Sequence, residues 1–373
     1  MEVARPLRMS FPDINEDDVR AVAEVLRSGQ LGLGPRAEAL GSELARRCGV
    51  RHGVAVSSGT AALHMIVRAL GLGRGDEVLV PSFTFAASVN VLLYEGATPV
   101  FVDVDPDTCN LSPAELECKV TPRTKAVMVV DAFGHPAEWD EILAIAARRR
   151  LQVIDDSCEA LGAEYNGQPL GRFGRAAAFA FYPNKQITTG EGGAIVTDDD
   201  EIAGLARSLR NQGRDEMGAW LDHARLGYNY RMDEMSAALG LSQLARLDDL
   251  LARRRRVAEL YGERLQDVGW LAPPVVRPHV RMSWFVYVVK LAQGFHRDPV
   301  IGALAQQGIP ARGYFNPVHR LPHIREVLGG RDPDLPVTEA LAARALALPF
   351  HGGMTEDEVD RVVEGLQRVR KKL

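Results

Sequence analysis

The stretch VAVSSGTAALHMIVRALG, residues 54–71, combines three features of one structural unit. A short apolar run ends at Val56, small hydroxyl residues and a glycine follow, and apolar residues then recur at helical spacing. The pattern predicts a strand, a turn and a helix. The first N–H groups of a helix lack partners within it, so Ser58, Gly59 and Thr60 are candidates for a phosphate cradle. These residue types are also common helix caps, so the turn alone leaves a purely structural role open.

The same alternation of apolar runs and helical segments fills the first two thirds of the chain. Most of the runs are separated by segments long enough for a crossover helix. The pattern predicts an α/β fold with a seven-stranded, mostly parallel sheet that is buried on both faces. In addition, Asn166 and Gly167 predict a local hairpin. The apolar runs are residues 54–56, 77–81, 99–104, 125–130, 152–156, 177–181 and 194–197.

The pattern changes after about residue 235. A long helical stretch leads to one extended run, SWFVYVVKL (283–291), and then to mixed short elements. We therefore expect a large domain over residues 1–250 and a smaller C-terminal α+β domain over residues 251–373. Within the first domain, the segment of about residues 1–30 is expected to pack on the small domain.

Composition restricts the classes of function. The 373 residues carry a formal net charge of -5, which gives no reason to expect nucleic acid or an anionic membrane as partner. No stretch approaches the roughly 18 apolar residues of a membrane span, and residues 1–18 contain no apolar h-region, so we expect neither a membrane span nor a signal peptide. The cysteines lack C-x-x-C spacing, which favours reduced thiols and a cytoplasmic location. They are Cys48, Cys109, Cys118 and Cys158.

Two charged stretches resemble binding sites but fail on detail. The run Arg253–Arg256 lies in a helical segment flanked by acids, so its side chains would point around the whole circumference. This arrangement predicts a solvated helix and no polyanion site. The segment 103–114 begins like a calcium loop, yet Thr108 and Ala114 stand where glycine and glutamate are needed. No metal site is therefore expected.

Charged residues follow two of the predicted strands. Asp155 and Asp156 end one apolar run, and Lys185 follows another. The carboxyl ends of parallel strands form the usual ligand edge of such sheets. Adjacent strand residues point to opposite faces, so only one of the two acids can face a common site, and loop capping remains an alternative for both.

A phosphate cradle, a carboxylate and a lysine are the minimum set of groups for pyridoxal 5′-phosphate (PLP). The lysine forms a Schiff base with the cofactor, and the carboxylate keeps the pyridine nitrogen protonated. Phe85, which follows a further predicted strand, could stack on the cofactor ring.

Six segments resemble, in order and spacing, the sugar aminotransferase family typified by DegT and StrS. The resemblance extends from about residue 10 to the LALPF segment (346–350), and the lysine segment is its most specific part. It implies the type I aminotransferase fold and a homodimer with active sites at the subunit interface. The segments are SSGTAAL (57–63), PSFTFAAS (81–88), IDDSCEALGAEYNG (154–167), FYPNKQITTGEGGAIVT (181–197), RNQGR (210–214) and LGYNYRMDEMSAALGLSQL (226–244).

The resemblance assigns the central chemistry to two residues. Lys185 is implied to be the Schiff-base lysine and the proton shuttle of transamination. Asp156, the second acid of the pair, is implied to be the partner of the pyridine nitrogen.

The phosphate contacts implied by the resemblance come from both subunits. Gly59 and Thr60 would contribute from the turn after the first strand, and Asn229 from the partner subunit. Many members have a further serine ligand five residues before the lysine, but this chain has Ala180. The missing hydrogen bond would place more weight on Ser58, Thr60 and Asn229.

Two side chains are expected around the cofactor ring. Phe85 would stack on it. Many members have glutamine or histidine three residues after the aspartate, where this chain has Glu159, close to the cofactor's phenolic oxygen. A carboxylate there must be protonated or hydrogen-bonded elsewhere to avoid repelling a phenolate, so its contact with the cofactor stays open.

The family relationship also implies the substrates. The amino donor would be L-glutamate, and the acceptor a keto sugar on a nucleoside diphosphate, such as a 4-keto-6-deoxy hexose, for amino-sugar, polysaccharide or antibiotic biosynthesis. Arg312, Tyr314 and His319 would face the sugar nucleotide, although surface-loop contacts are an alternative.

Other readings of the same fold stay open. The acceptor could be a cyclitol ketone, and the protein could be a non-catalytic PLP-binding regulator. A sugar dehydratase branch of the family carries histidine in place of the lysine, so Lys185 argues against that activity. The nucleotide and the position of the ketone are left open by the sequence.

Overall fold

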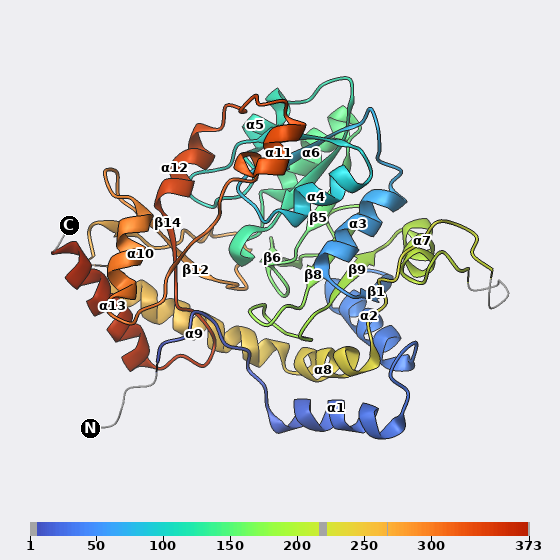
Figure 1. The fold of residues 1–373 in the computed structure, drawn as a ribbon, viewed down its shortest axis with the longest axis horizontal. Helices are drawn as coiled ribbons and strands as arrows, with labels where there is room; N and C mark the ends of the chain where they lie inside the picture. Colours follow the sequence, from blue (N-terminus) through green and yellow to red (C-terminus); the bar gives the residue numbers. More distant parts are fainter. Residues whose placement is uncertain (1–5, 216–221, 267, 372–373) are drawn as a thin grey trace.

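The computed structural model describes residues 6–215, 222–266 and 268–371. A seven-stranded sheet forms the centre of the larger part of the molecule (Figure 1). Each of the predicted apolar runs overlaps one of its strands. In sheet order these are β1 (His52–Val56), β9 (Gly193–Thr197), β8 (Ala176–Ala180), β5 (Gln152–Asp156), β4 (Thr124–Val130), β2 (Glu77–Pro81) and β3 (Thr98–Val102).

The sheet is mostly parallel, as the sequence predicts, with one exception. Strand β9 runs antiparallel to both of its neighbours, β1 and β8. The connection from β8 to β9, residues 181–192, contains no helix, so the chain reverses direction without a crossover. This reversing connection carries Lys185.

Helices cover both faces of the sheet, and the strand residues alternate between them. Val54 and Val56 pack in one apolar cluster with α3, α4 and α7, whereas Ala55 packs in another with α2 and α8. A further cluster joins α5 and α6 to the sheet. The helices of this part are α1 (Glu16–Ser28), α2 (Pro35–Cys48), α3 (Gly59–Ala69), α4 (Ala87–Tyr94), α5 (Pro113–Cys118), α6 (Trp139–Arg149), α7 (Asp200–Arg210) and α8 (Glu234–Ala245).

The predicted hairpin is present between two short strands. Asn166 and Gly167 both have positive φ, 49° and 71°, as a tight two-residue turn requires. The hairpin pairs with a strand from the C-terminal part to form a three-stranded sheet. Its strands are β6 (Glu164–Tyr165), β7 (Gln168–Pro169) and β11 (Val280–Arg281).

The C-terminal part has its own sheet and core. Helix α9 (Leu247–Leu265) leads into it and crosses the expected domain boundary at residue 250. The sheet order is β10 (Leu271–Ala272), β12 (Tyr287–Leu291), β14 (Ala345–Leu348) and β13 (Arg312–Gly313). The other helices are α10 (Arg297–Ala305), α11 (Pro322–Val327), α12 (Pro336–Arg344) and α13 (Glu356–Arg370), and the 3₁₀ turns of the chain are η1 (Ala132–Gly134) and η2 (Val318–Arg320).

The N-terminal segment contacts both parts of the molecule. Leu7 is buried in the core of the C-terminal part, and the Phe350 N–H donates to the Met9 carbonyl at 3.0 Å. Helix α1 packs instead on α8, where buried Asp18 accepts hydrogen bonds from Gln243 and Arg246. Residues 1–5 of the segment expected on the small domain lie outside the described residues.

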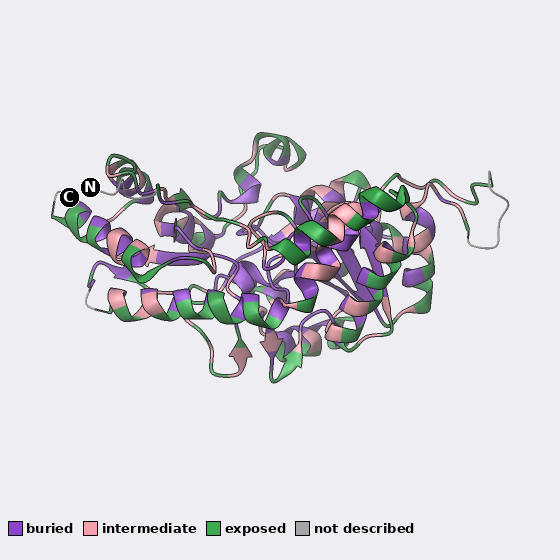
Figure 2. Cartoon of the chain, turned by 90° about the horizontal axis from the view of Figure 1, so that it is seen from below, coloured by how far each residue is buried: buried purple, intermediate pink, exposed green. Residues whose placement is uncertain are grey.

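Buried residues are concentrated inside the larger part and inside the C-terminal part of the molecule. Figure 2 shows buried residues inside both parts and exposed residues on the outer faces of the helices. The prediction of a fully solvated arginine run is wrong at one position, because Arg254 on α9 is only 6% exposed. Among the described helices, none is both long and apolar enough to cross a membrane.

Candidate active site

A cavity of about 500 Å³ opens at the carboxyl ends of the central strands. It is bordered by the start of α3, the loop after β2, the end of β5, the β8–β9 connection and the segment after β13. The structure therefore brings together residues that lie far apart in the sequence. The predicted site residues that line the cavity are Ser58, Gly59, Thr60, Phe85, Asp156, Glu159, Lys185, Arg312 and Tyr314.

Lys185 lies in the β8–β9 connection with its side chain 12% exposed. Its N–H donates to the Tyr182 carbonyl at 2.9 Å, which folds the connection into a turn. The amine nitrogen lies 3.9 Å from the centroid of the Phe285 ring and 3.8 Å from a carboxyl oxygen of Glu159. Its position is thus defined by a π face and an acid.

Of the two adjacent acids, Asp156 is the one that lines the cavity. Its carboxylate accepts a hydrogen bond of 2.6 Å from the Ser88 hydroxyl and one of 3.2 Å from the Cys158 N–H. Ser88 in turn lies 3.1 Å from the Thr84 hydroxyl. These contacts fix the orientation of the Asp156 carboxyl group at the end of β5.

Asp155 points away from the cavity and forms a buried pair with Asp131. The Ser157 oxygen lies 2.6 Å from a carboxyl oxygen of Asp155 and 2.9 Å from one of Asp131. A hydroxyl has one proton, so it can donate to only one of the two, and the other acid must bring its own proton. Burial raises the pKa of Asp155 to about 7, and burial together with the Asp155 charge raises that of Asp131.

The carboxyl group of Glu159 is hydrogen-bonded to the main chain, as a carboxylate at this position requires. One of its oxygens accepts a 2.9 Å hydrogen bond from the N–H of Phe133, and the other faces Lys185. Phe133 has φ 62°, an uncommon conformation for a bulky residue. Burial raises the pKa of Glu159, and the Lys185 charge and the Phe133 N–H act in the opposite direction.

The turn before α3 is a helix N-terminus held close to the strands. Ser58 caps the helix by accepting from the Ala61 N–H at 3.0 Å, so the N–H groups of Gly59 and Thr60 remain without intrahelical partners. A Cβ on Gly59 would lie 2.7 Å from Cβ of Ala180. Gly59 therefore permits a close approach that no larger residue would allow.

Side chains from the loop after β2 and from the C-terminal part close the cavity. Phe85 is 65% exposed at its mouth. Tyr314 packs against the rings of Phe133 and Phe285, and its burial raises its pKa to about 12. Arg312, on β13, is exposed and offers a cation at the same opening.

Several cavity residues were not predicted from the sequence. Phe285 belongs to an apolar run that has no local sign of a site, and Ser88 and Thr84 are ordinary small residues of a helix start. Asn184 also lines the cavity, and its side-chain oxygen is buried without a hydrogen-bond partner among the described residues. Thr84 and Ser88 lie in the same segment as Phe85, and Asn184 precedes Lys185, so closeness in sequence to a predicted site residue was the signal that could have found these three.

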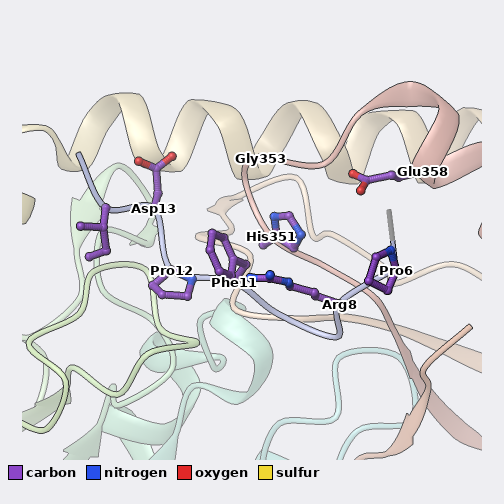
Figure 3. A pocket seen from close by; sticks show the side chains of 9 residues that line it. Pro6, Arg8, Phe11, Pro12, Asp13, His351, Gly353 and Glu358 are labelled. Carbon is purple, nitrogen blue, oxygen red and sulfur yellow. The ribbon is translucent and has the colours of Figure 1, made fainter. Parts of the chain in front are cut away.

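A second hollow, of about 540 Å³, lies between the N-terminal segment and the residues around His351 (Figure 3). Figure 3 shows Asp13 close to the long helix α9, where its carboxylate pairs with Arg246 and Arg253. Arg8 stacks on the Phe11 ring at 4.3 Å. None of the predicted site residues described by the structure lines this hollow.

Comparison with known proteins is consistent with this geometry. The model of the DegT/DnrJ/EryC1/StrS aminotransferase family matches residues 12–367. The chain belongs to this family. It is therefore a PLP-dependent aminotransferase that acts on sugars.

Two curated relatives of the family cover most of the chain. GDP-perosamine synthase of Caulobacter vibrioides is 45% identical over 329 residues, 86% of each chain. The spore coat polysaccharide biosynthesis protein SpsC of Bacillus subtilis is 37% identical and covers 98% of this chain and 97% of its own.

Solved structures of the family share the fold. DesV of S. venezuelae, solved in complex with a ketimine intermediate, has a TM-score of 0.89 at 36% identity, with 95% of each chain covered. PseC of Helicobacter pylori, an aminotransferase involved in pseudoaminic acid biosynthesis, has a TM-score of 0.94 at 29% identity, with 99% of this chain and 100% of its own covered.

The residues present fit the family's cofactor. The cavity has a helix N-terminus for the phosphate, an oriented carboxylate at Asp156 and an amine at Lys185. Gly59 lets the start of that helix lie directly against Ala180 and Cys158. Ala180 also lines the cavity and has no hydroxyl to offer, whereas Ser58 and Thr60 each have one.

Two of the expected site residues do not join the others. Of the described residues, His319 is 2% exposed and absent from the cavity wall, and its ring nitrogens contact Ser82 at 2.7 Å and Glu339 at 2.8 Å. Asn229 is exposed, forms a β-bridge with Asn211, and is not among the described residues that line the cavity of its own chain. In this subunit, His319 thus holds two loops together and Asn229 faces outward.

Proposed function

We propose that this aminotransferase transfers the amino group of L-glutamate to a keto hexose carried on a nucleoside diphosphate, with a 4-keto-6-deoxy hexose as acceptor. The observation that carries the proposal is the open cavity in which the Lys185 amine and the Asp156 carboxylate meet. The name of the Caulobacter relative, GDP-perosamine synthase, supports a nucleoside diphosphate as carrier.

Lys185 and Asp156 have separate tasks in the proposal. The Lys185 amine would hold the cofactor covalently and would move a proton at the reacting carbon of the substrate. Asp156 keeps a proton on the pyridine nitrogen, and the Ser88 hydroxyl and Cys158 N–H keep its carboxylate in place. When bound, the cofactor supplies an electron-accepting ring.

The other groups around the cavity suit different parts of the cofactor and the substrate. The open N–H groups of Gly59 and Thr60 suit the cofactor phosphate. Arg312 lies at the opening, where the diphosphate of a sugar nucleotide would leave the cavity. Tyr314 adds a half-buried aromatic wall for a sugar ring.

A second subunit completes the proposed site. We infer a homodimer in which Asn229 of one chain contacts the phosphate at the site of the other. Asn229 is exposed and is not among the described residues that line the cavity of its own chain, which supports this assignment. A C2 dimer would place two such equivalent sites at the interface.

Spectroscopy and a product assay test the proposal. The protein loaded with PLP should absorb at roughly 410–430 nm and lose this band when L-glutamate is added. The aminated protein is then offered UDP-, dTDP- and GDP-linked keto sugars and cyclitol ketones, and the aminated product is identified by mass. Product from a sugar nucleotide supports the proposal, whereas product from cyclitol ketones alone contradicts the acceptor, and an unchanged spectrum contradicts the donor.

A further inference from the structure

Arg254 is a buried cation directly behind the proposed active site. Its neighbours in the run, among them Arg255, are exposed on α9, but Arg254 is only 6% exposed. Burial lowers its pKa to about 10, so it remains charged at neutral pH. A buried charge is costly unless hydrogen bonds satisfy it, so its partners indicate what it does.

All of the hydrogen bonds that the structure gives the Arg254 guanidinium go to main-chain carbonyls of described residues. One terminal nitrogen donates to Lys185 at 2.6 Å and to Asn184 at 3.3 Å. The other donates to Trp284 at 3.2 Å and to Phe285 at 3.3 Å. One planar group therefore ties together two segments that lie about a hundred residues apart in the sequence.

These two segments carry the Lys185 amine and the aromatic ring against which it lies. The first segment contains Lys185 itself, and the second contains Phe285, whose ring lies 3.9 Å from the amine nitrogen. Within the second segment the chain adopts an uncommon conformation at Trp284, whose φ is 55°. A fork of fixed donors can hold both backbones at once, whereas a lysine presents a single point charge.

We propose that Arg254 is a positioning residue that sets the placement of the Lys185 amine against the Phe285 ring by binding the main chains of both. The inference rests on the proposed role of Lys185. Since small displacements of a reacting group can cost up to about 10²-fold in rate, loss of the fork should slow chemistry at the amine more than it weakens substrate binding.

The test compares Arg254→Lys with Arg255→Lys, a matched change one residue away on the exposed face of the same helix. First, borohydride reduction of the wild-type protein with PLP, followed by peptide mapping, identifies the attached lysine. This step tests the proposed role of Lys185 by itself. Attachment at another lysine would reject that role and, with it, the inference.

Two readouts then test Arg254. In stopped-flow mixing of cofactor-free protein with PLP, Arg254→Lys should form the band at roughly 410–430 nm about tenfold more slowly than wild type. In steady state, its kcat should fall about tenfold while KM for glutamate stays within about twofold. Arg255→Lys should match wild type in both. A merely structural role would lower the unfolding temperature without this division between kcat and KM.

Two results would overturn the inference. One is a linkage rate and kcat in Arg254→Lys equal to those of the control, and the other is a raised KM with unchanged kcat. If Arg254→Lys does not fold, Arg254→Gln is measured in its place, because its amide can still donate to carbonyls of one segment. The same changes in linkage rate, kcat and KM are then expected of Arg254→Gln, and the same two results would overturn the inference.

Discussion

A carboxyl oxygen of Glu159 lies 3.8 Å from the amine nitrogen of Lys185, while the other carboxyl oxygen accepts the N–H of Phe133. The acid is thus anchored on one side and faces the proposed reactive amine on the other. Only the neutral form of an amine attacks an aldehyde, and a neighbouring negative charge in general opposes that form.

Replacing Glu159 with glutamine should therefore speed the reaction of cofactor-free protein with PLP. The amide keeps an acceptor for the Phe133 N–H but removes the negative charge, and we expect a roughly threefold to tenfold faster rise in absorbance at neutral pH. The gain should shrink as pH falls, because the raised pKa of Glu159 means that wild type already loses its charge there. Glu141→Gln, on the exposed side of α6, is the control; an equal rate in both variants would contradict the expectation.

Asp156→Asn should preserve the shape of the site but remove the charge that holds the pyridine proton. We expect kcat to fall at least about 10²-fold with the cofactor still bound, as judged by its absorbance after gel filtration. Asp155→Asn is the matched comparison, since its side chain points away from the cavity. A severe loss of kcat in the Asp155 variant alone would show that Asp155, and not Asp156, has this role.

The buried acid pair should make the protein less stable as pH rises. Burial raises the pKa of Asp155 from 3.8 to about 7 in the folded protein, so between these values the folded chain holds a proton that the unfolded chain has released. This contribution to stability is complete below about pH 4 and is lost as pH rises through about 7. Asparagine mimics the protonated acid and should escape the loss.

Thermal unfolding of Asp155→Asn and wild type from pH 4 to pH 8 measures this effect. The difference in Tm should move by several degrees in favour of the variant as pH rises. Asp334→Asn, at an exposed loop position, controls for the loss of one negative charge. Parallel curves for Asp155→Asn and wild type would show that Asp155 is ionised throughout.

Asn229 tests whether the site is shared between subunits. Chains with Lys185→Ala and chains with Asn229→Asp should each be nearly inactive alone, because one lacks the amine and the other repels the phosphate. In a heterodimer one site inherits both defects and the other inherits neither, so activity should return toward half of the wild-type value. Co-expression with two affinity tags isolates the heterodimer; no recovery there would place Asn229 at the site of its own chain.

Much of this architecture could be predicted from local sequence. The apolar runs predict all the strands of the central sheet, because strands buried on both faces need continuous apolar residues. Ser58, Asp156 and Lys185 were found since polar residues directly after such strands meet at one edge of the sheet. The apolar runs did not indicate that β9 is the antiparallel strand, because the direction of a strand depends on how the short connection before it folds.

Contacts between distant segments were beyond sequence reasoning. Arg254 looks like its exposed neighbours, and only the packing of α9 against the loops around Lys185 and Phe285 buries it. Asp131 likewise ends an ordinary apolar strand, and its pairing with Asp155 depends on the spacing of β4 and β5.

The reversal between β8 and β9 links folding quality to cofactor retention. Both ends of the connection that carries Lys185 are ladder-paired strands, and β9 also packs on the turn before α3, where a Cβ on Gly193 would lie 2.5 Å from the Ser58 carbonyl carbon. We therefore expect the Lys185 amine and the turn before α3 to reach their places only when β1, β8 and β9 have paired. We therefore expect bound PLP to report a fully paired sheet, and we expect a destabilising change along β1, β8 or β9 to lower the absorbance of the cofactor before the protein unfolds.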